Sequence, residues 1–351
     1  MSKIGSLTSH EIHSQYESLK KTYDLFQARK AEIADFYAKN TPERVVLIGS
    51  GSSFSICQSA AVSIRLKLGV EANAVAAGDL MLHTDSYAPM LKNAWIIALS
   101  RSGATHEVLN TINIVRSGYG CKVVGIVCVE GSPISVSSDL SIEVPWSFDE
   151  SVCQTRSVSN LYASVQLLTA VCSGAAGIEE EIAGIAENGA AYLEKIEPVV
   201  AQIACSREWK NAFVLADGEM AGIADEAALA LTEISYLYSK QSRVLDVRHG
   251  PILLANQSTI MLVCVNQDGK EHQLKLVKDL VARGAGVILF SAEPFDEVEG
   301  VLAQVDFGRK LSASTLSIPM LAIAQLFAYH NALQKGMNPD APGGLSAWIS
   351  L

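Results

Sequence analysis

The sequence lacks the features that mark several large classes of protein. Its seven cysteines show no CxxC pair and no metal-ligand spacing, which is typical of reduced, core-filling cysteines in a cytoplasmic protein. No run of Lys and Arg alternates with aromatic residues, and the net charge is −10, so nucleic-acid binding is not expected. The N-terminal stretch is polar, and no apolar run reaches about 18 residues, so neither a signal peptide nor a membrane span is expected.

The chain has enough apolar residues to form one large or two medium-sized domains, because 49% of its 351 residues are hydrophobic and 18% are charged. Hydrophobic periodicity predicts strands at 44–48, 72–76, 94–99, 122–128 and 140–144, and helices at 54–68, 104–117 and 155–173. The pattern restarts with strands at 211–216, 258–265 and 286–291, and helices at 219–239, 269–283 and 315–335. A first helix is expected at 9–39, capped by Thr8 or Ser9, and a helical connector at 175–208. Strands that alternate with helices predict an α/β fold of parallel sheets flanked by helices.

An internal repeat supports a division into two related halves. Residues 93–127 resemble residues 259–290 at a shift of 166 residues, which places Gly103 on Gly269 and Gly120 on Gly286. Each segment reads as a strand, a polar turn, an amphipathic helix, a glycine turn and a second strand. Matched glycines without a gap favour duplication over a chance likeness between two βαβ units.

The two halves differ at the turn after the strand. In the first half, the segment 100–105 (SRSGAT) offers three hydroxyls, a guanidinium and the N–H groups of a helix start, which together suit a phosphate group. In the second half, Asp268 and Glu271 replace Ser102 and Thr105, and two carboxylates at a helix start repel a dianion. One anion site per chain is therefore expected, in the first half.

The glycine-rich segment 49–54 (GSGSSF) is a second candidate phosphate loop. A dinucleotide fingerprint requires glycine where Phe54 stands, and a Walker loop requires Gly-Lys-Ser/Thr, which is absent. We therefore expect neither NAD nor ATP, and no cofactor or metal. Ser52 and Ser53 follow one strand and Ser100–Thr105 follow another, so their hydroxyls converge at the carboxyl edge of a parallel sheet. A dense group of hydroxyl side chains suits a polyhydroxylated, phosphorylated ligand such as a sugar phosphate.

At this point the motifs resemble those of the SIS (sugar isomerase) domain family. Leu99–Thr105 resembles the LSxSGxT signature, and residues 151–157 (SVCQTRS) resemble the segment that closes the sugar pocket. Residues 232–236 (TEISY) and 248–251 (RHGP) resemble the catalytic stretches of the isomerase half of glucosamine-6-phosphate synthase. The resemblance implies a pair of flavodoxin-like SIS domains, with the ligand on the first domain and close to a homodimer interface.

The resemblance also assigns residues to roles. Glu233 is implied as the base that moves a proton between C1 and C2, and His249, supplied by the neighbouring subunit, as the group acting on the ring oxygen or leaving group. The implied substrate-binding residues are Ser52, Ser53, Ser100, Arg101, Ser102, Thr105, Val152 and Gln154. Whether Arg101 and Arg156 contact the substrate is left open. No role is expected for the histidines His10, His13, His83, His106, His272 and His330.

The expected organisation is an N-terminal helix (1–40), a first SIS domain (41–175), a helical connector (176–208), a second SIS domain (209–335) and a C-terminal tail (336–351).

Departures from the synthase pattern reduce the number of reactions that the chain is expected to catalyse. The synthase has a Schiff-base lysine near its C-terminus and another lysine three residues before the glutamate, and this chain has Ala347 and Ala230 there. There is also no glutaminase segment, so glutamine is not expected as a nitrogen source. The preferred hypothesis is a deglycase or deaminase of fructosamine or aminosugar 6-phosphates, and the alternative is an aldose–ketose phosphosugar isomerase. An alternative of another class is a sugar-phosphate sensor, which the retention of Glu233 and His249 disfavours.

Overall fold

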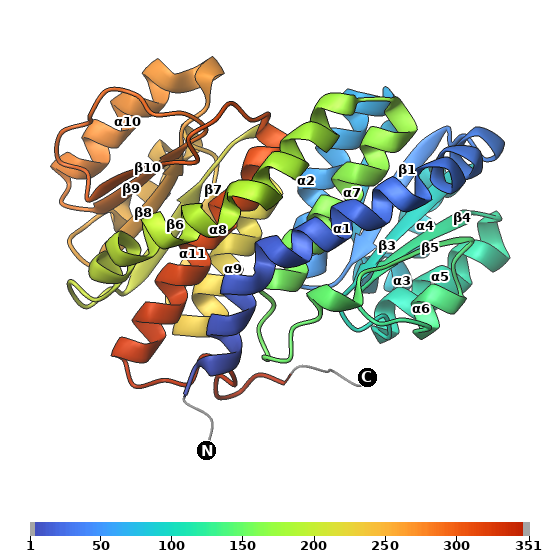
Figure 1. The fold of residues 1–351 in the computed structure, drawn as a ribbon, viewed down its shortest axis with the longest axis horizontal. Helices are drawn as coiled ribbons and strands as arrows, with labels where there is room; N and C mark the ends of the chain where they lie inside the picture. Colours follow the sequence, from blue (N-terminus) through green and yellow to red (C-terminus); the bar gives the residue numbers. More distant parts are fainter. Residues whose placement is uncertain (1–3, 347–351) are drawn as a thin grey trace. The chain divides into compact units, whose positions relative to one another are not determined.

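The computed structural model describes residues 4–346, and these form two compact units (Figure 1). The first unit comprises Ser14–Glu150 and Gln154–Glu187. The second unit comprises the residues up to His13, the segment Ser151–Cys153 and Asn188–Leu345. Ala347, one of the departures noted above, lies outside the described residues.

The first unit is built on a five-stranded parallel sheet of order β2-β1-β3-β4-β5. The strands are β1 (Arg44–Gly49), β2 (Glu71–Ala76), β3 (Ala94–Ser100), β4 (Lys122–Val127) and β5 (Leu140–Glu143). The helices up to the connector are α1 (Ser6–Lys39), α2 (Ser52–Leu68), α3 (Ala77–Leu82), α4 (Thr84–Leu91), α5 (His106–Tyr119), α6 (Pro133–Val136) and α7 (Arg156–Ser173). β3 is buried along its whole length, as expected of a central parallel strand covered on both faces.

The side chains of β1 alternate between the two faces of this sheet. Val46 and Ile48 join a core with Val108 and Ile112 of α5, on the face that α3 and α4 also cover. The opposite face is covered by α2 and α7, which pack against each other. The sheet is therefore covered by helices on both faces, and its strand ends are left for the loops that carry function.

The second unit repeats this topology in the sheet order β10-β9-β8-β6-β7. Its strands are β6 (Asn211–Leu215), β7 (Tyr238–Ser242), β8 (Thr259–Cys264), β9 (Gly286–Ser291) and β10 (Ala303–Asp306). Its long helices are α8 (Ala176–Ala204, shared with the first unit), α9 (Ala221–Ser235), α10 (Lys270–Ala282) and α11 (Ala313–Gln334). The shared strand order makes β8 the counterpart of β3, as the internal repeat predicts, and makes β6 the counterpart of β1.

In the part of the chain that the structure describes, one helix is long and apolar enough to cross a membrane by length and composition alone. This helix is α11, and 89% of its most apolar window is buried inside the protein. Phe327 of α11 packs against Trp209, with ring centroids 6.1 Å apart, and Tyr192 of α8 donates a hydrogen bond to the carbonyl of Pro319 at 3.2 Å. These contacts identify α11 as a core helix of the second unit.

The structure confirms most expected elements and corrects three. The first helix begins at Ser6, so Thr8 lies inside it and donates both its backbone N–H and its hydroxyl to Asp340 Oδ1 at 2.9 Å instead of capping the helix. The helix expected at 219–239 ends at Ser235, because Tyr236 adopts a left-handed conformation (φ 53°). The residues that follow form β7, which had been expected to be partly helical.

Candidate functional site

The switch point of the first sheet lies between β1 and β3, because the chain leaves β1 toward β2 and returns on the other side at β3. Two helices begin at this edge, α2 after Gly51 and α5 after Thr105. Neither helix start has a side-chain capping hydrogen bond. Uncapped first-turn N–H groups carry partial positive charge, so two anion-accepting helix starts follow neighbouring strands.

Three hydroxyl side chains predicted to hold phosphate form one connected cluster. Ser100 Oγ lies 2.8 Å from Thr105 Oγ1 and 3.3 Å from Ser102 Oγ. Ser100 Oγ also accepts a hydrogen bond from the N–H of Gly103 at 3.0 Å, and Ser102 Oγ accepts one from the N–H of Ala104 at 3.2 Å. Thr105 is turned toward Ser100 instead of capping α5, which leaves the helix start open to a ligand. We call Ser100, Ser102 and Thr105 the hydroxyl cluster.

Ser52 and Ser53 lie in the first turn of α2, at the end of the strand that neighbours β3. Both are buried, with 5% and 4% of their surface exposed. Their place on an uncapped helix start fits the predicted contact with the sugar phosphate, and that contact remains a prediction.

Arg101 follows the hydroxyl cluster's first serine and is also buried, at 7% exposed. Its guanidinium lies 5.9 Å from the ring centroid of Phe148, within the range of a cation–π contact. A guanidinium held against an aromatic ring loses little further freedom when it binds an anion.

Asp149 is a structural residue near the site that the sequence reasoning missed. It is 1% exposed, and its Oδ2 accepts hydrogen bonds from the N–H of Thr155 at 2.7 Å and from the N–H and hydroxyl of Ser157 at 2.9 and 2.6 Å. Asp149 thereby caps α7 with a carboxylate, so this helix start is closed to phosphate. The sequence does contain one sign of this cap, since an acidic residue precedes a helix start that is rich in Thr and Ser. The capping geometry depends on the loop and could not be read from the sequence.

The Asp149 cap also orders two residues singled out from the sequence. Gln154 Oε1 lies 3.1 Å from Ser157 Oγ, whose proton it shares with the Asp149 carboxylate. Arg156 Nε lies 3.6 Å from Asp149 Oδ1, and Arg156 Nη1 donates to Ser14 Oγ at 3.0 Å. Arg156 therefore has protein partners at its guanidinium, which is a structural role.

Val152 belongs to the second unit, with the segment Ser151–Cys153. Its N–H donates to the carbonyl of Asp340 at 3.0 Å. The N–H of Ser151 donates to the buried carboxylate of Glu11 at 3.0 Å, and its hydroxyl donates to the other oxygen of that carboxylate. This segment is thus tied to the first helix and to the tail near residue 340.

Glu233 lies in the last turn of α9, two residues before the helix ends, and is partly exposed. Two contacts hold this helix end. Lys335 Nζ donates to the carbonyl of Ser235 at 2.8 Å, and the hydroxyl of Tyr236 donates to the carbonyl of Gly343. Burial lowers the pKa of Lys335 below its usual value, the direction expected of an ammonium moved away from water. The end of the helix that carries Glu233 is therefore held by Lys335 and by the tail.

His249 is exposed on a turn of the second unit. It follows a short 3-10 helix (Asp246–Arg248) and precedes Gly250, whose φ of +132° is a conformation that glycine adopts readily. The side chains of Leu245, Leu253 and Leu254 around this turn are also exposed, at 44%, 78% and 41%.

Two histidines that were given no role share one carboxylate in the second unit. His13 Nε2 lies 2.8 Å from Glu197 Oε2, and His330 Nε2 lies 2.9 Å from Glu197 Oε1. Burial lowers the pKa of His13, but its hydrogen bonds to Glu197 and to the Ser9 carbonyl outweigh this and raise the pKa above 6.5. Burial raises the pKa of Glu197, and the bonds from both histidines outweigh it and bring the pKa below 4.5. No local sequence pattern predicts this cluster.

The structure thus groups the predicted residues by unit. The first unit holds the hydroxyl cluster, Ser52, Ser53, Arg101 and Gln154. The second holds Val152, Glu233 and His249. Within residues 4–346, no group of three or more His, Cys, Asp or Glu side chains is arranged to hold a metal ion.

Comparison with known proteins identifies the family of both halves. The SIS domain model matches residues 40–171 and 207–300. Glutamine–fructose-6-phosphate aminotransferase (isomerizing) of Pyrobaculum aerophilum is 26% identical over 97% of this chain and 57% of its own length. The enzyme of the same name from Clostridium acetobutylicum is 27% identical over 74% of this chain and 44% of its own length. The chain therefore spans about half the length of these curated relatives.

Solved structures share the fold over nearly the whole chain. The tagatose-6-phosphate ketose/aldose isomerase of Escherichia coli superposes with a TM-score of 0.86 at 22% identity, covering 99% of this chain and 96% of that one. The glucosamine-6-phosphate deaminase of Thermotoga maritima superposes with a TM-score of 0.81 at 23% identity, covering 99% and 100%. Likeness at this level of identity shows a shared two-domain architecture.

Proposed function

We propose, from the premise that the chain belongs to the SIS domain family, that it is an enzyme acting on a fructosamine or aminosugar 6-phosphate and releasing an amine. The observation that carries the proposal is the hydroxyl cluster beside the uncapped start of α5. It combines neutral donors with a helix dipole, which together suit a phosphate dianion. Relatives named for phosphosugar reactions support the substrate class.

The reaction uses Glu233 as the base. In the open-chain ketosamine, Glu233 removes a proton from C1, which gives an enaminol, and a proton returned to C2 leaves an imine at C1. Water adds to the imine carbon and the amine leaves, so the products are an aldose phosphate and a free amine. His249 gives a proton to the ring oxygen when the ring opens. The synthase has a lysine at the position of Ala230. The proposed reaction therefore proceeds by proton transfer without the side-chain amine of that lysine.

The second candidate function is aldose–ketose isomerisation of a phosphosugar without release of an amine. It uses the same base and the same C1 and C2 atoms. The structural likeness to the tagatose-6-phosphate isomerase of Escherichia coli is the observation that favours it.

A substrate screen distinguishes these reactions. The protein is assayed with 6-phosphorylated ketosamines, aminosugars and ketoses, and free amine and isomerised sugar are measured separately. Amine release from a ketosamine phosphate is the expected result. Isomerised sugar alone would establish the second function, and binding without turnover would indicate a sensor.

Replacement of the base tests the mechanism. Glu233→Gln keeps the size of the side chain and is expected to lower kcat at least about 100-fold while sugar-phosphate binding is retained. Glu271→Gln is the matched control, since Glu271 is a fully exposed residue of the second unit paired with Lys275. Undiminished turnover in Glu233→Gln would refute the base assignment.

A further inference from the structure

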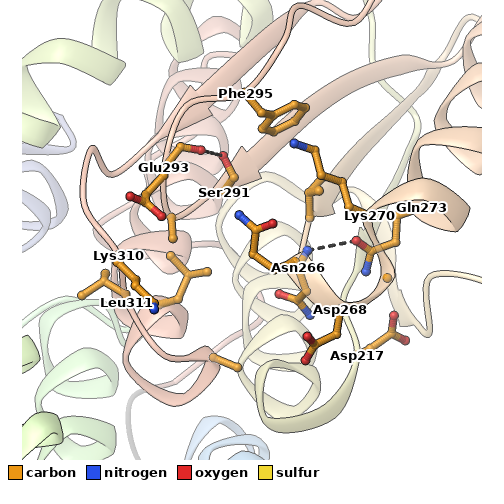
Figure 2. Close-up of a pocket in the computed structure, with 16 residues that line it drawn as sticks. Asp217, Asn266, Asp268, Lys270, Gln273, Ser291, Glu293, Phe295, Lys310 and Leu311 are labelled. Carbon is orange, nitrogen blue, oxygen red and sulfur yellow. Dashed lines mark hydrogen bonds between the residues drawn. The ribbon is translucent and has the colours of Figure 1, made fainter.

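A pocket of about 480 Å³ opens at the carboxyl edge of the second sheet (Figure 2). It is lined by loops that follow three strands and by the segment before α11. Asp217 follows β6, Asn266–Lys270 follow β8, Ser291 and Glu293 lie at the end of β9, and Lys310 precedes α11. Neither Glu233 nor His249 lines this pocket. The lining of this pocket is therefore separate from the two residues proposed for catalysis.

The pocket occupies the switch point of the second sheet. The chain leaves β6 toward β7 and returns on the other side at β8, as it does for β1, β2 and β3 in the first sheet. In open parallel sheets this is the place where ligands bind. The volume also lies within the usual range of small-molecule sites, about 300–1,000 Å³. The duplicated fold thus presents a pocket at the position where the first unit has its hydroxyl cluster.

The charge at this switch point is opposite to that needed for phosphate. Asp217, Asp268 and Glu293 contribute carboxylates to the lining. Within residues 4–346, the side chains of Asp268 and Glu293 have no hydrogen-bond or ion-pair partner, while Asp217 Oδ1 accepts from the N–H of Val244 at 3.0 Å. A phosphate dianion would be repelled here, and a cation would be attracted.

The lysines do not cancel this negative charge. The Lys270 ammonium is turned toward the ring of Phe295, 4.2 Å from its centroid, where a cation–π contact holds it (Figure 2). Lys310 lies on the same side of the pocket as Glu293 in this view, and Asp217 and Asp268 lie on the other. The Asp217 and Asp268 carboxylates therefore lie apart from the Lys310 ammonium in this view.

One amide side chain of the lining has a free hydrogen-bond donor. Gln273 is 4% exposed and lines the pocket, and its Oε1 accepts from the N–H of Asn266 at 2.9 Å. Its Nε2 donates to no acceptor among the described residues. This N–H group is therefore available to an oxygen atom of a ligand in the pocket.

We propose that this pocket is a second ligand site, which binds a small molecule bearing a primary ammonium group next to hydroxyl or carboxylate oxygens. Asp268 binds the ammonium, Glu293 adds to the negative charge of the pocket, and Gln273 and Lys310 bind the oxygens. Two sources share this chemistry, a free hexosamine and a free amino acid. The site goes beyond the proposed reaction and does not depend on it, because its residues are separate from those that carry that reaction.

Calorimetric titration of the whole protein tests the proposal, with D-glucosamine, glycine and L-lysine as the ammonium probes and glucose 6-phosphate as the phosphate probe. At least one ammonium probe is expected to bind at one site per chain. The double variant Asp268→Asn/Glu293→Gln is expected to weaken that binding about 10- to 100-fold, the range for the loss of charged hydrogen bonds. Both side chains are exposed, so the fold is expected to be retained, and circular dichroism checks this.

Two further variants make the result specific. Glu271→Gln removes a carboxylate next to the pocket but not of its lining, and should leave ammonium binding unchanged. Ser102→Asp/Thr105→Glu copies the second-half acids into the hydroxyl cluster, and should abolish glucose 6-phosphate binding while ammonium binding persists. Failure of the proposed function would remove phosphate binding from the wild type and leave this site intact.

The probe that binds identifies the class of ligand. Binding of glucosamine alone identifies a hexosamine, and binding of the amino acids alone identifies an amino acid. The proposal is overturned if no ammonium probe binds saturably, if binding survives in Asp268→Asn/Glu293→Gln, or if glucose 6-phosphate still binds in Ser102→Asp/Thr105→Glu and loses that binding in Lys310→Met.

Discussion

Gly103 lies directly against Ser132: a Cβ atom built on Gly103 would stand 2.0 Å from Ser132 Oγ and 2.4 Å from Ser132 Cβ. Gly103 also has a φ of +63°, which side chains disfavour, and its carbonyl accepts a hydrogen bond from the N–H of Ile134 at 2.8 Å. The turn that presents the hydroxyl cluster is therefore fixed by the absence of a side chain.

Gly103→Ala is expected to displace this turn. We expect the free energy of unfolding to fall by about 2–4 kcal/mol, since backbone strain adds to overpacking, and the KM for the sugar phosphate to rise at least tenfold. Chemical denaturation and steady-state kinetics measure both quantities. Gly131→Ala is the matched control, because Gly131 has a φ of +61° but no atom within 4 Å of its Cβ position. Equal effects from the two variants would show that the contact with Ser132 is unimportant.

Much of the fold could be predicted from the sequence because buried parallel strands appear as short apolar runs. β3 and β9 are such runs, and both were expected within a residue of their bounds. β7, with the sequence YSKQS, is a polar edge strand without apolar alternation and was therefore missed. The hydroxyl cluster could be predicted because its residues are close in sequence. The contact between His13 and Glu197 joins residues 184 positions apart, which no local pattern reveals.

Removal of the Asp149 carboxylate is expected to loosen the start of α7. Asp149→Ala leaves the N–H groups of Thr155 and Ser157 without an acceptor in a buried place, so the free energy of unfolding should fall by about 2–3 kcal/mol. Hydrogen exchange should show faster exchange in the first turn of α7. Glu130→Ala removes an exposed carboxylate of the same unit and should change neither. Unchanged stability in Asp149→Ala would contradict the capping role.

Mixing two inactive variants tests whether His249 comes from the neighbouring subunit. If each site combines Glu233 of one chain with His249 of another, Glu233→Gln mixed with His249→Asn should regain about a quarter of wild-type activity after subunit exchange. The exposed leucines around His249 support such an interface. Activity that stays at the level of the separate variants would place both residues in one chain.

The histidine pair at Glu197 predicts a pH-dependent contribution to stability. The pKa of His13 is raised above 6.5, so its contribution is full below that value and is lost as the pH rises through the raised pKa. The pKa of Glu197 is lowered, so its own contribution is present above 4.5 and lost only under more acidic conditions. The cluster therefore stabilises the fold most at mildly acidic pH.

Glu197→Gln should accordingly lower the melting temperature more at about pH 5.5 than at about pH 8. His13 and Glu197 are partly exposed, so we expect a difference of only about 2 °C, which corresponds to about 0.5–1 kcal/mol. His83→Asn is the control, since His83 lies 3.9 Å from Asp79 and both are largely exposed. A loss of stability independent of pH would show that the cluster acts through packing.

The hydrogen bonds from Thr8 to Asp340 have a consequence for biosynthesis. They join residues 332 positions apart, so the start of the first helix is made long before its partner. At about 5–20 residues per second, the delay between the two is roughly 17–66 s. During that time the first unit can form its sheet from contiguous chain, while the second must wait for α11 and the residues beyond it. Synthesis therefore completes the contiguous residues of the first unit well before the partner that holds the start of the first helix.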